Sequence, residues 1–196
     1  MGIGRKITRK AVFLDRDGVI NPNVWNEAAK AFESPHRVED FRLNPGAAQA
    51  MRDLQKAGYA LIVVTNQPSY AKNKKTPLEA ITAINDRLRF DLAQEGVSLK
   101  AVFTCLHHPE STLPGYGVCA CRKPSPYFLL QAERWFGIDL HASWMVGDRA
   151  TDIACAQGAG VKAIQVSGQG EAGADPRPLA HVQDLTQAAA LILQSA

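Results

Sequence analysis

Short apolar runs alternate with longer helix-like stretches along most of this chain, and this alternation constrains the fold more than any other feature. The runs are rich in valine, isoleucine and aromatic residues, as buried parallel strands are, and they cover residues 11–14, 60–64, 101–104, 144–146 and 161–166. Helix-like segments lie between them, at residues 45–57, 77–95, 126–136 and 151–158. We therefore expect an α/β fold, in which an open, doubly wound, mostly parallel Rossmann-like sheet carries helices on both faces.

Length and charge narrow the class of protein. The chain has 196 residues, 46% of them apolar, which is enough to bury a full core, and we expect residues 1–196 to form a single domain. The net charge is only +3, with much of the excess in a basic N-terminal arm at residues 1–10, whereas nucleic-acid binders are usually far more basic. The sequence has no apolar run of the roughly 18 residues that a membrane span needs, and residues 1–10 lack the apolar stretch of a signal peptide. We therefore expect a cytoplasmic monomer that binds neither nucleic acid nor a membrane.

Polar residues follow four of the predicted strands directly. The first strand runs into DRDG at 15–18, the second into TNQ at 65–67 and the fourth into GDRATD at 147–152, while the third ends at Cys105 and His107. In an open α/β sheet, ligands bind at the carboxyl ends of the strands. We expect these residues to share one rim of the sheet, which makes that rim the candidate functional site.

Four carboxylates are predicted to meet at this rim: Asp15, Asp17, Asp148 and Asp152. The two-residue spacing of the first pair lets one carboxylate face a reaction centre while the other reaches a leaving group, and Gly18 permits the sharp turn. A hard divalent cation with oxygen ligands is the natural way to hold so many carboxylates together, and Mg²⁺ is usual where phosphate also binds. The alternative is that the first two aspartates are turn or cap residues.

A second cluster of candidate ligands consists of Cys105, His107, Cys119 and Cys121. A Cys₃His set suits tetrahedral Zn²⁺, and because four protein ligands leave no open position, such a zinc is structural. It would pin residues 105–121 as a zinc loop. Free thiols or a chance cluster remain alternatives, His108 is an alternative ligand, and Cys155 is interpreted as a small core residue.

Four ordered motifs carry a resemblance to a known family. FLDRDGVIN at 13–21, VTNQ at 64–67, RKP at 122–124 and GDRATD at 147–152 resemble the motifs of haloacid dehalogenase (HAD) superfamily phosphatases. The resemblance covers about residues 10–166 and implies an HAD-like sheet without a large cap domain. One subgroup carries a CxH…CxC zinc loop just before RKP and includes the heptose bisphosphate and histidinol-phosphate phosphatases.

The resemblance implies roles for the acidic residues. Asp15 would be the nucleophile, and Asp17 the general acid that protonates the leaving oxygen and then activates water. Mg²⁺ would be held by Asp15, the backbone carbonyl of Asp17 and Asp148. Asp152 would orient Lys123 or a metal-bound water.

The remaining motifs are expected to contact the transferring phosphoryl group. Thr65 and Asn66 would hydrogen-bond its oxygens, and Lys123 would balance the negative charge that develops on the phosphoryl group in the transition state. Taken singly, Thr65 could be a helix cap and Lys123 a solvated surface charge.

The substrate is expected to be a small phosphorylated metabolite. Arg122 could hold a second phosphate, which favours D-glycero-D-manno-heptose 1,7-bisphosphate or a related sugar phosphate over histidinol phosphate. The alternative is that Arg122 caps a carbonyl or pairs with an acidic residue. Residues 22–42 and the zinc loop are candidate covers of the site. The sequence PSYAK at 68–72 departs from the usual heptose-enzyme pattern. Histidinol-phosphate phosphatase and a catalytically silent metal- and partner-binding module are the alternative functions.

Overall fold

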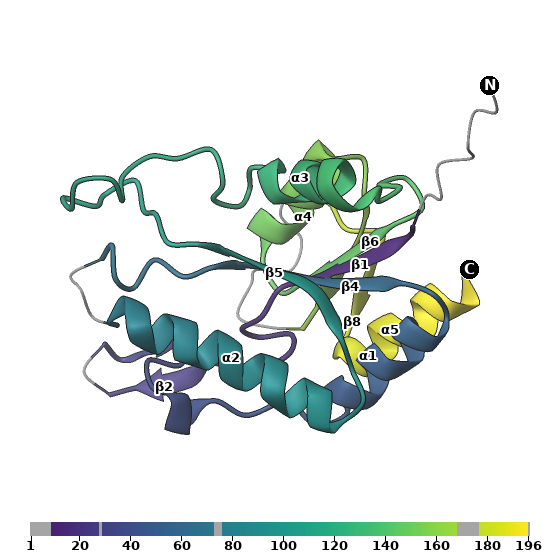
Figure 1. Cartoon of the computed structure of the whole chain (residues 1–196), viewed down its shortest axis with the longest axis horizontal. Helices are drawn as coiled ribbons and strands as arrows, with labels where there is room; N and C mark the ends of the chain where they lie inside the picture. The colour runs from purple at the N-terminus through teal and green to yellow at the C-terminus, as the bar shows by residue number, and fades with distance from the viewer. Residues whose placement is uncertain (1–8, 28, 73–75, 168–176, 196) are drawn as a thin grey trace.

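A computed structural model describes residues 9–27, 29–72, 76–167 and 177–195, so most of the basic N-terminal arm lies outside the described residues. Its main feature is a six-stranded sheet in which all neighbouring strands are parallel (Figure 1). The strand order is β5 (Leu99–Cys105), β4 (Ala60–Asn66), β1 (Ala11–Leu14), β6 (Trp144–Gly147), β7 (Lys162–Val166) and β8 (Ala180–Val182).

Helices cover both faces of this sheet (Figure 1). One face packs against α1 (Ala47–Lys56), α2 (Leu78–Gln94) and α5 (Leu185–Gln194). The other packs against α3 (Tyr127–Phe136) and α4 (Ala150–Gly158). The doubly wound α/β fold predicted from the sequence is confirmed.

The central strand β1 shows how the sequence builds the two layers. Val12 and Leu14 belong to the core beneath α1, α2 and α5, whereas Ala11 and Phe13 belong to the core beneath α3 and α4. All four side chains are fully buried. Because successive side chains of a strand point to opposite faces, a strand covered on both sides must be apolar at every position, and β1 is.

The five predicted strands and four predicted helices are all present, but several elements were not anticipated. A two-stranded antiparallel hairpin of β2 (Val24–Asn26) and β3 (Ala31–Glu33) follows β1 and leads into a 3₁₀ turn, η1 (Val38–Asp40). After the undescribed residues 168–176, β8 and α5 extend the sheet and cover it. Among the described residues, no helix combines the length and apolarity that crossing a membrane would require.

The sheet order places the rim of interest at the topological switch point. The chain moves from β1 outward to β4 and β5, then returns to β6 on the opposite side of β1 and continues to β7 and β8. Loops that leave β1 and β6 therefore diverge, which opens a crevice at the carboxyl ends of these two strands. The β2–β3 hairpin and the long segment between β5 and α3 lie on the same side of the molecule in Figure 1.

Candidate active site

Three carboxylates meet at the switch point. Asp15 follows β1, Asp148 follows β6, and Asp152 lies in the first turn of α4. Each offers an oxygen within 4.8 Å of the other two, and all three residues are buried. Like charges this close repel one another in a site shielded from water, so the arrangement requires a compensating positive charge.

Two glycines make this close approach possible. A Cβ on Gly147 would lie 2.2 Å from the Cβ of Asp152, and a Cβ on Gly18 would lie 2.4 Å from Oδ2 of Asp148. Gly18 also has a φ of +86°, a conformation that other residues rarely adopt. The glycines of the DRDG and GDRATD segments thus leave the space that the carboxylates fill.

Lys123 supplies one compensating charge. Its ammonium lies 2.8 Å from Oδ1 of Asp15 and 2.6 Å from Oδ1 of Asp152, and it donates a 2.8 Å hydrogen bond to the carbonyl of Val64. The residue is only 3% exposed. Burial alone would lower the pKa of Lys123, but the charges of Asp15 and Asp152 raise it, so the ammonium stays charged. The interpretation of this lysine as a solvated surface charge is therefore wrong.

Lys123 alone does not neutralise the three carboxylates. Burial raises the pKa of Asp15 from 3.8 to about 7, with Asp152 and Asp148 adding to the effect and Lys123 opposing it. Burial, followed by the charge of Asp152, raises the pKa of Asp148 to about 6. Neither oxygen of Asp148 has a hydrogen-bond partner among the described residues, and the nearest cation is Nε of Arg149 at 3.9 Å. A divalent cation would satisfy these orphaned oxygens.

Asp152 is held at both ends of its carboxyl group. Oδ2 accepts a 3.1 Å hydrogen bond from the backbone N–H of Arg149, which caps the first turn of α4, while Oδ1 faces Lys123. The contact with Lys123 agrees with one of the two roles predicted for this residue.

Asp17 is turned toward a different set of partners. Its carboxyl group accepts hydrogen bonds from Arg16, Asn21, Gln67 and Ser34. Burial would raise the pKa of Asp17, but Arg16 and the uncharged donors together lower it. No role in the site was predicted from the sequence for any of these four partners.

Gln67 links Asp17 to Thr65. Its Nε2 donates to Oδ2 of Asp17 at 2.6 Å and to Oγ1 of Thr65 at 2.8 Å, and the residue is 2% exposed. Because the threonine oxygen accepts from the amide, its own hydroxyl hydrogen is left to donate elsewhere. Thr65 is the penultimate residue of β4, so it is not the helix cap that the sequence allowed.

The Cys₃His cluster also assembles. Nδ1 of His107 lies 3.7 Å from Sγ of Cys105 and 3.4 Å from Sγ of Cys121, and the three sulfur atoms lie 3.4–3.7 Å from one another. Tetrahedral Zn²⁺ with sulfur at about 2.3 Å requires sulfur separations near 3.8 Å, so the four atoms fit such an ion. His108 instead accepts from the N–H of Glu110, and Cys155 is buried, with its thiol donating to the carbonyl of Ser125. The chance-cluster alternative is disfavoured by this geometry.

Comparisons with known proteins agree with this site. A family model described as HAD-hydrolase-like matches residues 120–188. The D-glycero-beta-D-manno-heptose-1,7-bisphosphate 7-phosphatase of Yersinia pestis is 36% identical over 173 residues, which cover 84% of this chain and 87% of the relative. The chain belongs to the HAD superfamily.

Other HAD relatives extend the likeness. The D-glycero-alpha-D-manno-heptose-1,7-bisphosphate 7-phosphatase of Photorhabdus laumondii is 34% identical and covers 78% of this chain and 79% of the relative. The crystal structure of the D,D-heptose 1,7-bisphosphate phosphatase from B. bronchiseptica, complexed with magnesium and phosphate, matches with a TM-score of 0.79 at 30% identity. That match covers 95% of this chain and 99% of the other.

Two predicted substrate contacts have other partners in this HAD chain. Asn66 donates from Nδ2 to the carbonyl of Lys123 and accepts at Oδ1 from its N–H, both at 3.1 Å, so its side chain holds the RKP segment against β4. Arg122 donates from Nη1 to the carbonyl of His107 at 3.3 Å, which is the carbonyl contact that the sequence left open as an alternative. The assignment of both residues to substrate binding stays a prediction.

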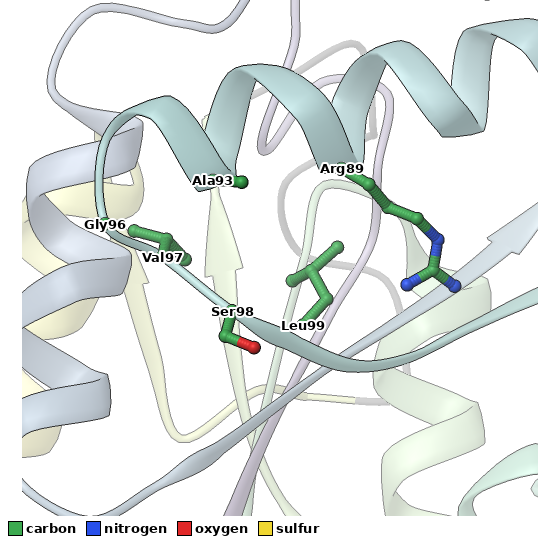
Figure 2. A pocket seen from close by; sticks show the side chains of 6 residues that line it. All are labelled: Arg89, Ala93, Gly96, Val97, Ser98 and Leu99. Atoms are coloured by element: carbon green, nitrogen blue, oxygen red, sulfur yellow. The ribbon is translucent and has the colours of Figure 1, made fainter.

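A surface hollow of about 340 Å³ lies elsewhere on this HAD fold, at the junction of α2 and β5 (Figure 2). It is lined by Arg89, Ala93, Gly96, Val97, Ser98 and Leu99. These residues lie at the carboxyl end of α2 and the amino end of β5, whereas the carboxylates lie at the carboxyl ends of the strands. The hollow is therefore separate from the candidate active site.

Proposed function

We propose that this chain is a Mg²⁺-dependent phosphatase that hydrolyses a phosphate monoester of a small sugar through an aspartyl-phosphate on Asp15. The observation that carries the proposal is the buried cluster of Asp15, Asp148, Asp152 and Lys123, in which a nucleophile, orphaned carboxylate oxygens and an ammonium lie together. The heptose bisphosphate phosphatases among its relatives support the reaction and the substrate class.

The donor set fits a magnesium ion. Mg²⁺ prefers oxygen ligands, and the free oxygens of Asp148 lie beside the carboxyl group of Asp15. We assign Asp15, Asp148 and the backbone carbonyl of Asp17 as its ligands. When bound, the ion offsets the repulsion between these carboxylates and a phosphate dianion.

The protein residues then divide the chemistry among themselves. An Asp15 oxygen attacks phosphorus and the ester P–O bond breaks. Asp17, which must first take up a proton against the lowering of its pKa by Arg16, gives that proton to the leaving alkoxide, which departs as the alcohol. Lys123 and the free hydroxyl hydrogen of Thr65 stabilise the charge on the transferring oxygens. In the second step Asp17 accepts a proton from water as that water attacks phosphorus, and the bond to Asp15 breaks to release inorganic phosphate.

The second metal in this proposal is structural. Cys105, His107, Cys119 and Cys121 would hold Zn²⁺ with no open position for a substrate. Arg122 and Lys123 follow the last of these ligands directly. Zinc would therefore restrain the loop and fix the positions of both side chains. None of the four cysteines forms a disulfide, which supports the expectation of a cytoplasmic location.

The proposed substrate is D-glycero-D-manno-heptose 1,7-bisphosphate or a close sugar phosphate. Arg122 would contact the second phosphate, and Asn66 would contact the phosphoryl group. Relatives carry names for both the alpha and the beta anomer, so both are included in the test. Phosphate release from the two heptose bisphosphates and from histidinol phosphate, with Mg²⁺ present, tests the assignment. We expect heptose bisphosphate to be preferred. A preference for histidinol phosphate would show that the substrate assignment is wrong.

The covalent mechanism has its own control. Asp15→Asn keeps the shape of the side chain but removes the nucleophilic carboxylate. We expect this variant to release no phosphate above background, and turnover that survived the substitution would refute the aspartyl-phosphate. A wild-type protein that hydrolysed none of the esters would instead favour a silent metal- and partner-binding module.

A further inference from the structure

A chain of hydrogen bonds runs from Asp17 to α2, away from the carboxylates of Asp15, Asp148 and Asp152. The guanidinium of Arg16, which is fully buried, donates to the carboxyl group of Asp17 through Nε at 3.2 Å and Nη2 at 3.1 Å. Its other terminal nitrogen, Nη1, donates to Oδ1 of Asn85 at 2.8 Å. Arg16 is thus fixed between the carboxyl group and one side chain of a helix that lies outside all four motifs.

Asn85 is itself fixed. Its Nδ2 donates to Oγ1 of Thr104 on β5 at 3.1 Å. Because arginine only donates, the amide oxygen must face Arg16, which sets the orientation of the amide and directs its nitrogen to Thr104. The neighbouring residues Ile81, Ile84 and Leu88 anchor this face of α2 in the core, so the asparagine projects from a rigid element.

We propose that Asn85 is a positioning residue for the general acid: by holding Arg16, it fixes where the carboxyl group of Asp17 lies relative to the leaving oxygen. The inference rests on the proposed function, because it assumes that Asp17 transfers the proton. Asn85 touches neither substrate nor metal in this scheme. Its effect passes through Arg16 alone, so it should be felt only when proton transfer to the leaving group matters.

The leaving group provides the readout. A sugar alkoxide departs poorly unless a proton reaches it, whereas p-nitrophenolate departs readily without one, and general acid catalysis contributes about 10²- to 10⁴-fold for groups that need it. A displaced Asp17 should therefore slow hydrolysis of a sugar phosphate and leave p-nitrophenyl phosphate nearly unaffected. General damage to the fold, the nucleophile or the metal site would slow both esters together.

The experiment compares wild type with Asn85→Ala, Thr104→Val and a control, Thr82→Ala, in saturating Mg²⁺. Thr82 lies on the same helix, is exposed, and its hydroxyl donates only to the carbonyl of Leu78 one turn back. For each protein, kcat is measured with p-nitrophenyl phosphate and with the alkyl phosphate of the substrate panel that wild type hydrolyses fastest. The rise in melting temperature on adding Mg²⁺ is measured in parallel.

For Asn85→Ala we expect kcat to fall about tenfold or more on the alkyl phosphate and to stay within about twofold on p-nitrophenyl phosphate. Thr104→Val, which frees the amide without removing it, should show the same selectivity to a smaller degree. Thr82→Ala should match wild type, and the Mg²⁺-induced rise should be the same in all four proteins. Equal losses on both esters, or no loss on either, would overturn the inference, whereas a wild type inactive on both would instead remove the proposed function.

Discussion

Replacing Asp148 by asparagine should stabilise the metal-free protein, although it removes a proposed ligand of Mg²⁺. Burial and the neighbouring Asp152 raise the pKa of Asp148 from 3.8 to about 6. The folded state therefore holds the proton more tightly than the unfolded state, so this group favours folding below about pH 4 and the advantage is lost as the pH rises to about 6. At 1.36 kcal/mol per pKa unit, ionisation of Asp148 lowers the free energy of unfolding by about 3 kcal/mol at pH 7.5.

Asparagine removes this charge at almost constant volume. Its amide nitrogen would also be a donor among acceptors, because oxygens of Asp15 and Asp152 lie within 4.8 Å of the present carboxyl oxygen. In Mg²⁺-free buffer at pH 7.5 we expect Asp148→Asn to melt about 6 to 12 °C above wild type, at about 2 to 4 °C per kcal/mol for a domain of this size. At pH 5 the gain should be about half as large, because Asp148 is then largely protonated in the folded wild type.

Differential scanning calorimetry or thermal fluorescence checks this prediction. Free Mg²⁺ is removed by a resin rather than by a soluble chelator, so that the proposed zinc stays on the cysteine cluster. Asp86→Asn, an exposed aspartate on α2, is the matched control and should stay within about 0.5 kcal/mol of wild type. Adding Mg²⁺ should raise the melting temperature of wild type but not of the variant. A variant that melted below wild type in Mg²⁺-free buffer at pH 7.5 would refute the reasoning.

Three further predictions concern the same site and the zinc loop. Lys123→Met should lower kcat by at least about 100-fold, because it removes the charge facing the transferring oxygens, and kinetics on p-nitrophenyl phosphate with circular dichroism as a folding check would measure this. The apparent Mg²⁺ affinity should rise between pH 5.5 and 8, because Asp15 and Asp148, with pKa values raised to about 7 and about 6, must lose protons to bind the ion. Titration calorimetry in two buffers would detect the released protons, and an affinity that did not change with pH would contradict this prediction. Cys119→Ser should lose one equivalent of zinc by elemental analysis and melt below wild type, whereas Cys155→Ser should keep its zinc.

The sequence predicted which segments form the site because parallel strands share an edge. Asp15, Thr65 and Asp148 each follow or end an apolar run, and the carboxyl ends of neighbouring parallel strands must lie together whatever the loops do. The contact of Lys123 with two of the carboxylates is a different matter, since it depends on the path of the 106–126 segment. Only the family resemblance brought that lysine into the site before the structure did.

Side-chain orientation was much harder to predict than position. Asn66 follows Thr65 in the chain, yet its amide turns to the backbone of Lys123, where it donates one hydrogen bond to the carbonyl and accepts another from the N–H. Arg16 lies between two aspartates and would ordinarily be interpreted as an exposed charge, whereas the structure buries it completely against Asp17 and Asn85. The contacts of Asn66 with Lys123 and of Arg16 with Asn85 join residues far apart in the sequence, and no local pattern encodes them.

Two kinds of element were not predicted from the sequence, for different reasons. The strands β2 and β3 are three residues each and partly exposed, so they lack a buried periodic pattern to detect. Helix α5 did carry a signal: Asp184 accepts a 2.9 Å hydrogen bond from the N–H of Gln187 as an N-cap, and an apolar run rich in alanine and leucine follows it. That helix was predictable from its cap and its composition.

Charge balance at the rim links the stability of the fold to its proposed chemistry. Asp17 is paired with Arg16, which leaves Asp15, Asp148 and Asp152 against one buried cation, the ammonium of Lys123; the guanidinium of Arg149, 3.9 Å from Asp148, is about half exposed to solvent. When these buried groups are all ionised, their net charge is −2, equal in size and opposite in sign to the charge of one divalent cation. Without a bound cation, the carboxylates would offset this repulsion by holding protons, and a binding cation would displace those protons. A phosphate dianion can approach Asp15 only after that exchange, which is why the same buried charges that weaken the metal-free fold would make the loaded site competent.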